Sequence, residues 1–547
     1  MKNKKVLPFI IGTFLLLVVG FIYYYVALPA INIHCVGFWY SIIFIFAALT
    51  IILGILKIMK DKGHRNTITI ESGDIKKALL SGGSKVFLIL TILVVVIYIG
   101  GNLLSSPIVN SGKYRELIEI NDSNFTEDIK QISYNEIPVL DKDSAILLGS
   151  RKMGNMVEYV SQFEVSSDYT QINYQSAPVR VSPLEYGSLI KWFTNQSDGI
   201  PAYMRIDMAT QNVECVKLEQ PIKYSKSDLF GRNIYRHIRF NYPTYIFDDI
   251  VFEIDEEGTP YWICPVKDYT IGLFGGETIS NVVIVNASTG EHTDYKIDEV
   301  PTWVDHAFSA KLLISYYDYY GTLKHGYLNS IFGQKDCLKT TDGYNYIALN
   351  DDVWVYTGVT SVGKDESNVG FVLMNQRTAE TKYYSIAGAE EYSAMASAEG
   401  KVQHLKYTAT FPLLLNIGGE PTYFIALKDA AGLVKSYAMV NISKYNIVAI
   451  GDSISDCEKS YKELLKSNNI STSDNSDLPQ VTGKITKMIE AVVDGNSHYY
   501  IMLENDTHIY DLVINDLIQI IKYNVGDTIT FSYIEDTTIR SVQMISE

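Results

Sequence analysis

The chain has 547 residues, enough for about three or four domains. Residues 1–105 carry ten Lys or Arg against three Asp or Glu, whereas the remaining 442 residues carry 36 against 59, so a basic segment is joined to an acidic one. An acidic portion of this size repels phosphate and excludes nucleic acid as a partner, and the 47% hydrophobic content excludes a disordered chain.

Three apolar stretches near the N-terminus predict membrane-spanning helices. They cover roughly residues 7–28, 36–56 and 86–104, each with about the 20 apolar residues that cross a bilayer core. A cleaved signal peptide is the alternative for the first stretch, but two more stretches follow it closely. None of them contains Asp, Glu, Lys or Arg, which transporters and proton relays use at membrane depth. We therefore interpret residues 1–106 as an anchor whose partner is the lipid bilayer.

Basic residues around these stretches predict the orientation of the chain. Three lysines precede the first stretch, and loop 57–85 holds seven Lys or Arg, whereas the hairpin between the first two stretches holds none. The positive-inside rule then predicts a multi-pass cell-membrane protein with a cytoplasmic N-terminus, a cytoplasmic loop 57–85 and an extracytoplasmic portion 107–547. Gly12, Gly20 and Gly37 would permit close approach of helices, so a homo-oligomer is compatible with the spans.

The extracytoplasmic portion contains a repeated pattern. Gly258-Thr-Pro260 and Gly419-Glu-Pro421 each open a predicted strand, and Gly199-Ile-Pro201 is a weaker version. A second strand then ends in a turn led by an asparagine, at Asn286, Asn375 and Asn441. Apolar stripes at helical spacing predict helices over 230–242, 304–316, 389–405 and 457–465. The repeated unit is therefore a helix followed by a small antiparallel sheet, which predicts an α+β fold.

The order of helix, FEIDEEGTPYW (residues 252–262) and VVIVNASTGE (residues 282–291) resembles the PepSY-type repeat of bacterial envelope proteins. The resemblance is best over 228–296 and weaker over 411–450. It implies a cystatin-like helix-on-sheet fold and a binding, scaffolding or regulatory role with an envelope protein or cell-wall enzyme as partner. It carries over no catalytic residue. On this basis 107–227 is a first α+β region, 228–300 a PepSY-like repeat and 301–466 an elaborated second repeat region.

The C-terminal portion is predicted to be a separate barrel. Residues 467–479 are polar and rich in turn formers, as in a linker. Residues 480–547 show five strand-like runs and one short helical stretch, which suits a small OB-like β-barrel. Because the chain is acidic and placed outside the cell, we expect this barrel to bind a protein or glycan, or to act as a spacer, rather than to bind nucleic acid.

Two motifs resemble a phosphate-binding loop and a hydrolase motif, but the neighbouring sequence does not fit either function. Gly358 to Lys364 nearly fits a phosphate-binding loop, but Asp365 stands where Ser or Thr would hold magnesium, and a hairpin loop is the alternative. Gly451-Asp-Ser453 resembles the first block of GDSL-type hydrolases, in which the serine is the nucleophile. Only 94 residues follow Ser453, too few for that domain, and helix capping is the alternative.

Metal and cofactor sites are not predicted. The nine histidines form no HxxH or HxxxH pair, there is no CxxC, and the acidic pairs lack calcium-loop spacing. The extracytoplasmic cysteines are expected to be buried free thiols, with two disulfides as the alternative: Cys215, Cys264, Cys337 and Cys457.

The polar, aromatic segment 340–407 is the predicted recognition surface. Its candidate binding residues are Trp354, Tyr356, Lys364, Asn375, Arg377 and Glu391, and the alternative is an elaborated sheet with ordinary turns. The sequence thus predicts a non-catalytic, membrane-anchored binding, scaffolding or regulatory protein of the bacterial cell envelope. The alternatives are an extracytoplasmic hydrolase that uses Ser453, or a membrane sensor, for which the cytoplasmic loop is too small to hold an output domain.

Overall fold

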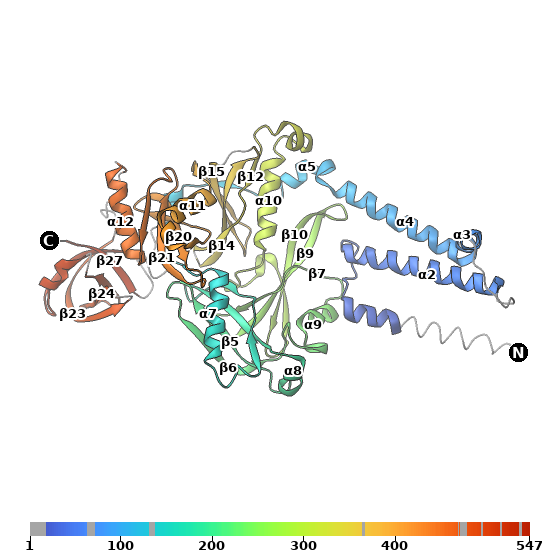
Figure 1. Cartoon of the computed structure of the whole chain (residues 1–547), viewed down its shortest axis with the longest axis horizontal. Helices are drawn as coiled ribbons and strands as arrows, with labels where there is room; N and C mark the ends of the chain where they lie inside the picture. Colours follow the sequence, from blue (N-terminus) through green and yellow to red (C-terminus); the bar gives the residue numbers. More distant parts are fainter. Residues whose placement is uncertain are drawn as a thin grey trace.

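The computed structural model is an elongated α+β protein with apolar helices at one end, four helix-and-sheet units in the middle and a small β-barrel at the other end (Figure 1). The C-terminus lies at the barrel end, opposite the first described helix. The structure describes residues 18–62, 72–130, 137–349, 351–363, 367–468, 470, 479–493, 496–514, 517–534 and 539–546.

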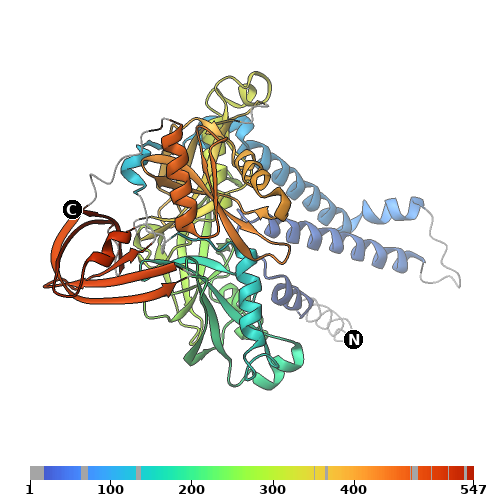
Figure 2. The same ribbon diagram turned by 60° about the vertical axis from the view of Figure 1, so that its left-hand side comes forward.

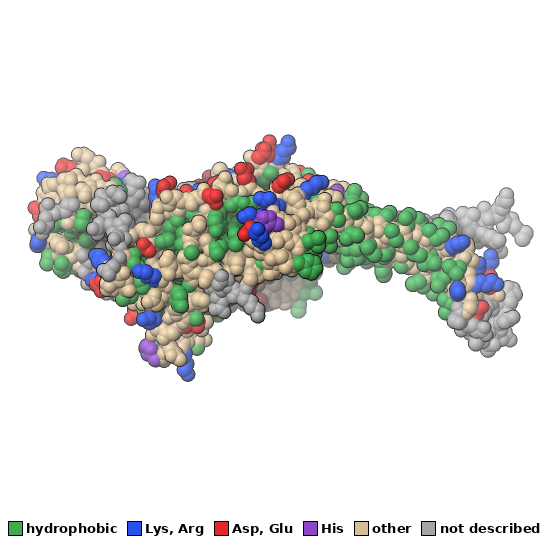
Figure 3. Space-filling view, turned by 90° about the horizontal axis from the view of Figure 1, so that it is seen from above, with side chains coloured by type: hydrophobic (Ala, Val, Ile, Leu, Met, Phe, Trp, Pro, Cys, Tyr) green, Lys and Arg blue, Asp and Glu red, His purple; other side chains and the backbone are tan. Residues whose placement is uncertain are grey.

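Two helices at the apolar end are long and hydrophobic enough to cross a bilayer. α2 (Val36–Lys62) and α4 (Gly82–Ser105) lie side by side (Figures 1 and 2). Their outward side chains are almost all hydrophobic in the face shown in Figure 3. Ser84 Oγ donates to the Thr50 carbonyl oxygen over 2.8 Å, which ties the two helices without a charge. The short helix α3 (Ser72–Leu79) precedes α4.

The first predicted span is described only in part. Residues 7–17 lie outside the described part of the chain, and the described remainder forms the apolar helix Val18–Ala27, which by itself has fewer residues than a bilayer core requires. Among the described residues, two helices therefore have spanning length, not the three that the sequence predicts.

The four units share one plan, in which a helix is followed by a small antiparallel sheet. In the sheet of each unit, two short strands pair with different parts of one long strand. On the other side of the long strand, two further strands follow in order. The helices are α7 (Lys142–Gly154), α9 (Ile234–Asn241), α10 (Ala310–Thr322) and α11 (Glu391–Lys401). The strands of the first two units are β2 (Phe163–Val165), β3 (Thr170–Tyr174), β4 (Ala177–Tyr186), β5 (Ile200–Asp207), β6 (Val213–Ile222), β7 (Ile246–Phe247), β8 (Val251–Ile254), β9 (Pro260–Ile271), β10 (Gly275–Asn286) and β11 (His292–Lys296).

The third and fourth units follow the same plan. Their strands are β12 (Leu338–Thr340), β13 (Asn345–Leu349), β14 (Asp352–Ser361), β15 (Ser367–Asn375), β16 (Thr381–Tyr384), β18 (Thr408–Ala409), β19 (Leu413–Ile417), β20 (Glu420–Lys428), β21 (Val434–Asn441) and β22 (Val448–Gly451). The added strand β17 (Gly388–Ala389) pairs with β15. Region 301–466, predicted as one elaborated repeat, thus holds two units, and region 107–227 holds another.

A side-chain-capped turn ends the long middle hairpin of every unit. Asp207, Asn286 and Asn375 each accept two backbone N–H bonds on Oδ1, and Asn441 accepts one from Lys444. The N–H group of the residue after the capping side chain donates to a carbonyl oxygen at the start of the long strand. These bonds run from Met208 to Pro178, from Ala287 to Pro260, from Gln376 to Val353 and from Ile442 to Pro421. The asparagine turns are therefore confirmed, and the sequence pattern missed only their aspartate counterpart.

In the first unit, the Gly-x-Pro pattern does not mark the start of the long strand β4. Gly199-Ile-Pro201 opens β5, whereas the turn that matches Gly258 to Pro260 runs from Gln175 to Pro178. Gln175 and Ser176 adopt φ values of 51° and 62° there, a left-handed conformation that elsewhere is taken by Gly258 at 82°. Because no glycine marks this turn, its sequence does not resemble the others.

The helix predictions are largely confirmed. Helices over 230–242, 389–405 and 457–465 correspond to α9, α11 and α12 (Ile454–Ser467). The helix predicted over 304–316 begins only at Ala310. The residues before it form a turn and a bend instead, and the N–H groups of Ala307 and Phe308 both donate to the Gln376 carbonyl oxygen that follows β15.

Successive units share hydrophobic cores, so the sheets are stacked. The first core joins the sheets of units one and two and includes Tyr203 and Trp262. The second joins the other face of the second sheet to α10 and the third sheet, and the third joins the third sheet to α11, the fourth sheet and α12. Each sheet in the middle of the stack is therefore covered on both faces, which accounts for its apolar strands.

The stack bends back, so that the first and fourth units meet. Lys428 Nζ of β20 lies 2.5 Å from Oδ2 of Asp141, the residue that caps the N-terminus of α7. Ser144 Oγ in α7 also donates to the Gly432 carbonyl oxygen. β1 (Asn121–Asp122), which lies before the units in the chain, pairs in parallel with β16. The four units therefore form one closed body.

The C-terminal domain is a closed five-stranded barrel around one apolar core that includes Ile501, Tyr510 and Phe531. Its strand order is β23–β24–β25–β27–β26, with the single parallel pair between β25 and β27. A 3-10 helix, Ile518–Lys522, lies between β25 and β26. The strands are β23 (Gln480–Val493), β24 (Asn496–Leu503), β25 (Ile509–Val513), β26 (Thr528–Ile534) and β27 (Ile539–Ser546). Most of the predicted linker lies outside the described residues.

All five cysteines are free thiols, but Cys215, which the sequence predicts to be buried like Cys264, Cys337 and Cys457, is only half-buried. Cys264, Cys337 and Cys457 are buried, and burial raises the pKa of the Cys457 thiol to about 12. Such thiols are unreactive and act as small apolar side chains.

Candidate functional site

The predicted recognition residues do not form one exposed surface. Trp354 and Asn375 face each other across β14 and β15, and both side chains are buried. The indole N–H of Trp354 donates to the Leu349 carbonyl oxygen over 3.0 Å, and Lys382 Nζ lies 5.6 Å from the ring centroid. Tyr356 and Glu391 are also buried, in a second cluster. Lys364 lies outside the described residues.

The second cluster is a buried polar group between β14, β15 and α11. Glu391 Oε2 accepts from Thr341 Oγ1 (3.1 Å) and Asn368 Nδ2 (3.3 Å). Its Oε1, the Tyr356 hydroxyl and the Asn368 Oδ1 have no hydrogen-bond partner. Burial raises the pKa of the Glu391 carboxyl. Burial in this cluster favours the neutral acid form of Glu391 over the charged carboxylate.

Replacing Glu391 with glutamine is expected to stabilise the protein by about 1 kcal/mol at pH 8, because the amide supplies a donor without a buried charge. A raised folded-state pKa gives stability that is complete below the unfolded value of about 4.3 and is lost as the pH rises through the folded value. The stability difference between the two proteins should therefore grow from pH 5 to pH 8, as measured by thermal unfolding. Glu391→Ala is the control and should be destabilising at both pH values, since it removes the carboxyl oxygen that accepts from Thr341 Oγ1 and Asn368 Nδ2.

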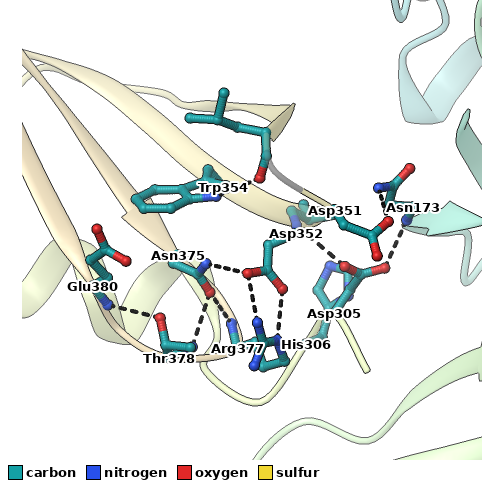
Figure 4. A network of polar contacts seen from close by, with 12 residues as sticks. Asn173, Asp305, His306, Asp351, Asp352, Trp354, Asn375, Arg377, Thr378 and Glu380 are labelled. Atoms are coloured by element: carbon teal, nitrogen blue, oxygen red, sulfur yellow. Dashed lines mark hydrogen bonds and ion pairs between the residues drawn. The ribbon is translucent and has the colours of Figure 1, made fainter. Parts of the chain in front are cut away.

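The first cluster lies where the third unit meets the others (Figure 4). Asp352 at the start of β14 accepts two hydrogen bonds from Arg377, Nε to Oδ1 (2.6 Å) and Nη2 to Oδ2 (2.8 Å), and a third from Asn375 Nδ2 (2.8 Å). Asn375 Oδ1 in turn caps the turn that carries Arg377. The asparagine turn thus orients the guanidinium group onto the carboxylate, and this paired contact raises the pKa of Arg377.

A second carboxylate pair continues this cluster into the first two units. Asp305 accepts the N–H of Asn173 in β3 (2.7 Å) and the N–H of Val353 in β14 (3.2 Å). Glu253 in β8 accepts the N–H groups of Asp305 and His306 and the His306 ring nitrogen Nδ1 (2.9 Å). Burial, and then the neighbouring Glu253 carboxylate, raise the pKa of Asp305 well above its usual range.

The cluster is therefore a polar joint between three units rather than a reaction centre. Its carboxylates are saturated by backbone N–H groups, Arg377 and His306, and it contains no nucleophile beside a base. The sequence prediction included Asn375 and Arg377 but missed Asp305 and Glu253. Glu253 could have been found as a charged residue within the otherwise apolar strand Val251–Ile254.

Ser453 caps a helix. Its hydroxyl accepts from the N–H of Asp456 (3.1 Å) and donates to Asp456 Oδ2 (2.7 Å) at the N-terminus of α12. This is the capping role that the sequence offered as the alternative to a GDSL-type nucleophile.

Two substitutions of Ser453 distinguish a helix cap from a catalytic nucleophile. Ser453→Ala should lower the free energy of unfolding by about 1 kcal/mol, whereas Ser453→Asp should retain the cap and the stability. Thermal unfolding of both variants measures this effect. If both variants instead lost an esterase or peptidase activity of the parent protein while Ser453→Asp stayed fully stable, Ser453 would be a nucleophile.

The near match to a phosphate-binding loop lies on a hairpin. Gly358 belongs to β14, which ends at Ser361, and β15 begins at Ser367 and pairs with it. A phosphate-binding loop must lead into a helix N-terminus. Here the chain leads into a strand, as the hairpin alternative predicted.

The tip of the β9–β10 hairpin joins the body to the apolar end. Leu273 and Phe274 form this tip, and both of their N–H groups donate to Ser105 Oγ at the end of α4 (2.8 and 3.1 Å). Phe274 also contacts Trp39 of α2 and Tyr98 of α4, with ring centroids 6.1 and 5.4 Å apart. The tip therefore contacts both long apolar helices at once.

The first apolar helix is held by α9. Arg239 Nε donates to the Leu28 carbonyl oxygen (3.0 Å) and Arg236 Nε to the Tyr25 carbonyl oxygen (3.3 Å), so two cations cap the C-terminus of this helix. The N–H of Ile31 donates to the Pro243 carbonyl oxygen just beyond α9. Three separate apolar helices are thus fixed to the second unit.

A metal site is not found in the part of the chain that the structure describes. No group of three or more His, Cys, Asp or Glu side chains there is placed to hold a metal ion. A small hollow lies where units one, three and four meet, lined in part by Leu140, Tyr346 and Phe411.

The barrel carries an exposed apolar strand end. Ile489, Val492 and Val493 of β23 are exposed near the turn that leads to β24. Figure 1 shows the barrel at the end of the molecule farthest from the apolar helices.

Comparisons with known proteins identify no relative. No protein-family model matches the chain, and a search of curated proteins finds no match.

Proposed function

We propose that this chain is a membrane-anchored, extracytoplasmic binding or scaffolding protein of the bacterial cell envelope, without catalytic activity. The observation that carries the proposal is the β9–β10 tip, which is hydrogen-bonded to α4 and packed against α2. A closed body fixed in this way to two helices of spanning length holds its far end at a constant distance from the bilayer. In this proposal the basic loop 57–85 faces the cytoplasm and residues 107–547 face outward.

We assign the four units to a PepSY-like, cystatin-like fold and the terminal domain to an OB-like barrel. The helix-led antiparallel sheets support the first assignment, and the closed five-stranded order with a helix between β25 and β26 supports the second. The partner is an envelope protein or a cell-wall enzyme, held by the barrel. The exposed side chains at the end of β23 are the proposed contact, since apolar groups that stand free on a barrel mark binding surfaces.

Crosslinking in intact membranes, followed by purification of the full-length chain and mass spectrometry, tests this proposal. We expect a reproducible partner that is lost in Val492→Asp. The matched control is Val525→Asp, at a valine in the turn before β26 that is 59% exposed, against 70% for Val492. A partner that survives Val492→Asp contradicts the proposed contact. Ester or peptide hydrolysis by the pure protein contradicts the non-catalytic proposal itself.

A further inference from the structure

The first unit carries an unusually apolar surface. Five side chains at its end are exposed by 63% to 86%, and together we call them the apolar tip: Val157, Leu189, Ile190, Phe193 and Phe230. Isolated exposed apolar residues are common on soluble proteins, but a contiguous group of large ones marks an interaction site.

Hydrogen bonds and packing hold the apolar tip in shape. Its side chains come from the turn after α7, from α8 (Leu189–Asn195) and from the 3-10 helix Phe230–Arg232. The side chain of Asn195 donates to Gln162 Oε1, and the N–H of Gly187 donates to the Gln162 carbonyl oxygen, so the first two segments are tied together. Trp192 is buried between α8 and Phe230, with ring centroids 5.9 Å apart. The apolar side chains therefore point outward from an ordered base.

The apolar tip is continuous with the first apolar helix through α9. The 3-10 helix that carries Phe230 leads directly into α9, whose Arg236 and Arg239 hold the C-terminus of Val18–Ala27. Phe240 of α9 packs edge-on against Tyr24 of that helix, 5.5 Å between centroids. Figure 1 places α9 at the end of the body from which the apolar helices emerge, and α8 at the lower edge of the body.

The charges around the apolar tip fit an anionic lipid surface. Its three segments contain two cations against one carboxylate, on a chain that is otherwise acidic: Lys191 and Arg232 against Glu158. Apolar side chains with neighbouring Lys and Arg are the composition of peptides that lie in the headgroup region.

We propose that the apolar tip inserts into the headgroup region of the same bilayer that α2 and α4 cross. This inference rests on the proposed membrane anchoring. It adds a second lipid contact, made by the folded body itself at a point beside the spans, so that the body stands on the membrane at a fixed angle.

The test uses the full-length chain in vesicles of phosphatidylethanolamine and phosphatidylglycerol. The half-buried thiols Cys35 and Cys215 are first replaced by serine, and the other three cysteines are buried. An environment-sensitive fluorophore is attached to Phe193→Cys, to Ile45→Cys within α2, or to Tyr445→Cys in the turn between β21 and β22, all of which are exposed positions. Quenching by lipids with doxyl groups near the headgroup reports contact with the bilayer.

We expect strong quenching and a blue-shifted emission at positions 193 and 45, and neither effect at 445. In the labelled Phe193→Cys protein, the added changes Leu189→Ser and Ile190→Ser should abolish the quenching without changing the thermal unfolding. Quenching at 45 with a solvent-like emission at 193 overturns the inference and leaves the anchor intact. Failure at both 45 and 193 contradicts the anchor. The label at 193 could instead show a blue-shifted emission without lipid quenching, together with crosslinking between two copies of the chain. This result would assign the apolar tip to a homo-oligomer interface and would also overturn the inference.

Discussion

Replacing Asp352 with alanine is expected to lower the free energy of unfolding by about 2–3 kcal/mol, one of the two largest effects of a single substitution that we predict for this chain. The change leaves the Arg377 guanidinium group without its two hydrogen bonds and removes the acceptor of Asn375. Breaking a buried ion pair costs about 3–5 kcal/mol, and the partial exposure of Arg377 reduces this cost. Chemical denaturation of the full-length chain in detergent measures the effect.

Asp351 provides the matched control. It is the neighbouring aspartate, it is exposed, and its Oδ1 accepts one hydrogen bond from Asn173. Asp351→Asn keeps this acceptor and tolerates the left-handed φ of 66° at this position, so stability should be unchanged. Equal destabilisation by both variants would contradict the role assigned to the contact between Asp352 and Arg377.

Replacing Gly275 with alanine is expected to separate the body from the apolar end, at a cost of about 1–3 kcal/mol. A Cβ atom at this position would lie 2.9 Å from the Ile271 carbonyl oxygen and closer still to the Ser105 carbonyl oxygen and the Tyr114 hydroxyl. Two of these three are backbone atoms that cannot rotate away, so the hairpin tip must shift. The shift would break the hydrogen bonds that Ser105 Oγ accepts from the tip.

Spin-label distances between Tyr40→Cys in α2 and Tyr445→Cys in the fourth unit measure this separation. They should be narrow in the parent protein and broad in Gly275→Ala. Gly231→Ala is the control, because no atom lies within 4 Å of the added Cβ. A narrow distance distribution in Gly275→Ala would show that the hairpin tip does not fix the body, and would weaken the scaffold proposal.

The elements that were predicted well are those whose signal is local. Long uncharged runs predict α2 and α4, and asparagine turns after apolar strands predict three of the four units. Units three and four were predicted as one region because the long strand of unit three, β14, is preceded by Asp351, with φ of 66°, in place of the glycine that precedes β9 and β20. An aspartate in that position does not distinguish a strand start from an ordinary turn.

The candidate site was predicted poorly, because burial is a property of the whole stack. Trp354 and Tyr356 look like exposed recognition residues in a polar segment, but the fourth sheet and α11 cover that face of β14. Asp305 and Asn173 are 132 residues apart, and no spacing in the sequence predicts their contact. Leu273 and Phe274 did carry a signal, since two large apolar residues between Gly272 and Gly275 are unusual in an exposed turn.

The contact between the first and fourth units sets a condition on folding. Asp141 and Lys428 are 287 residues apart, and Asn416 Nδ2 donates to the Ile129 carbonyl oxygen over the same separation. Because the chain is made from its N-terminus, the surface of unit one that meets unit four stays uncovered until nearly three hundred more residues have been made. Long-range closure of this kind slows folding and leaves apolar surface open to aggregation. The first unit is therefore open to aggregation for longer than the last unit.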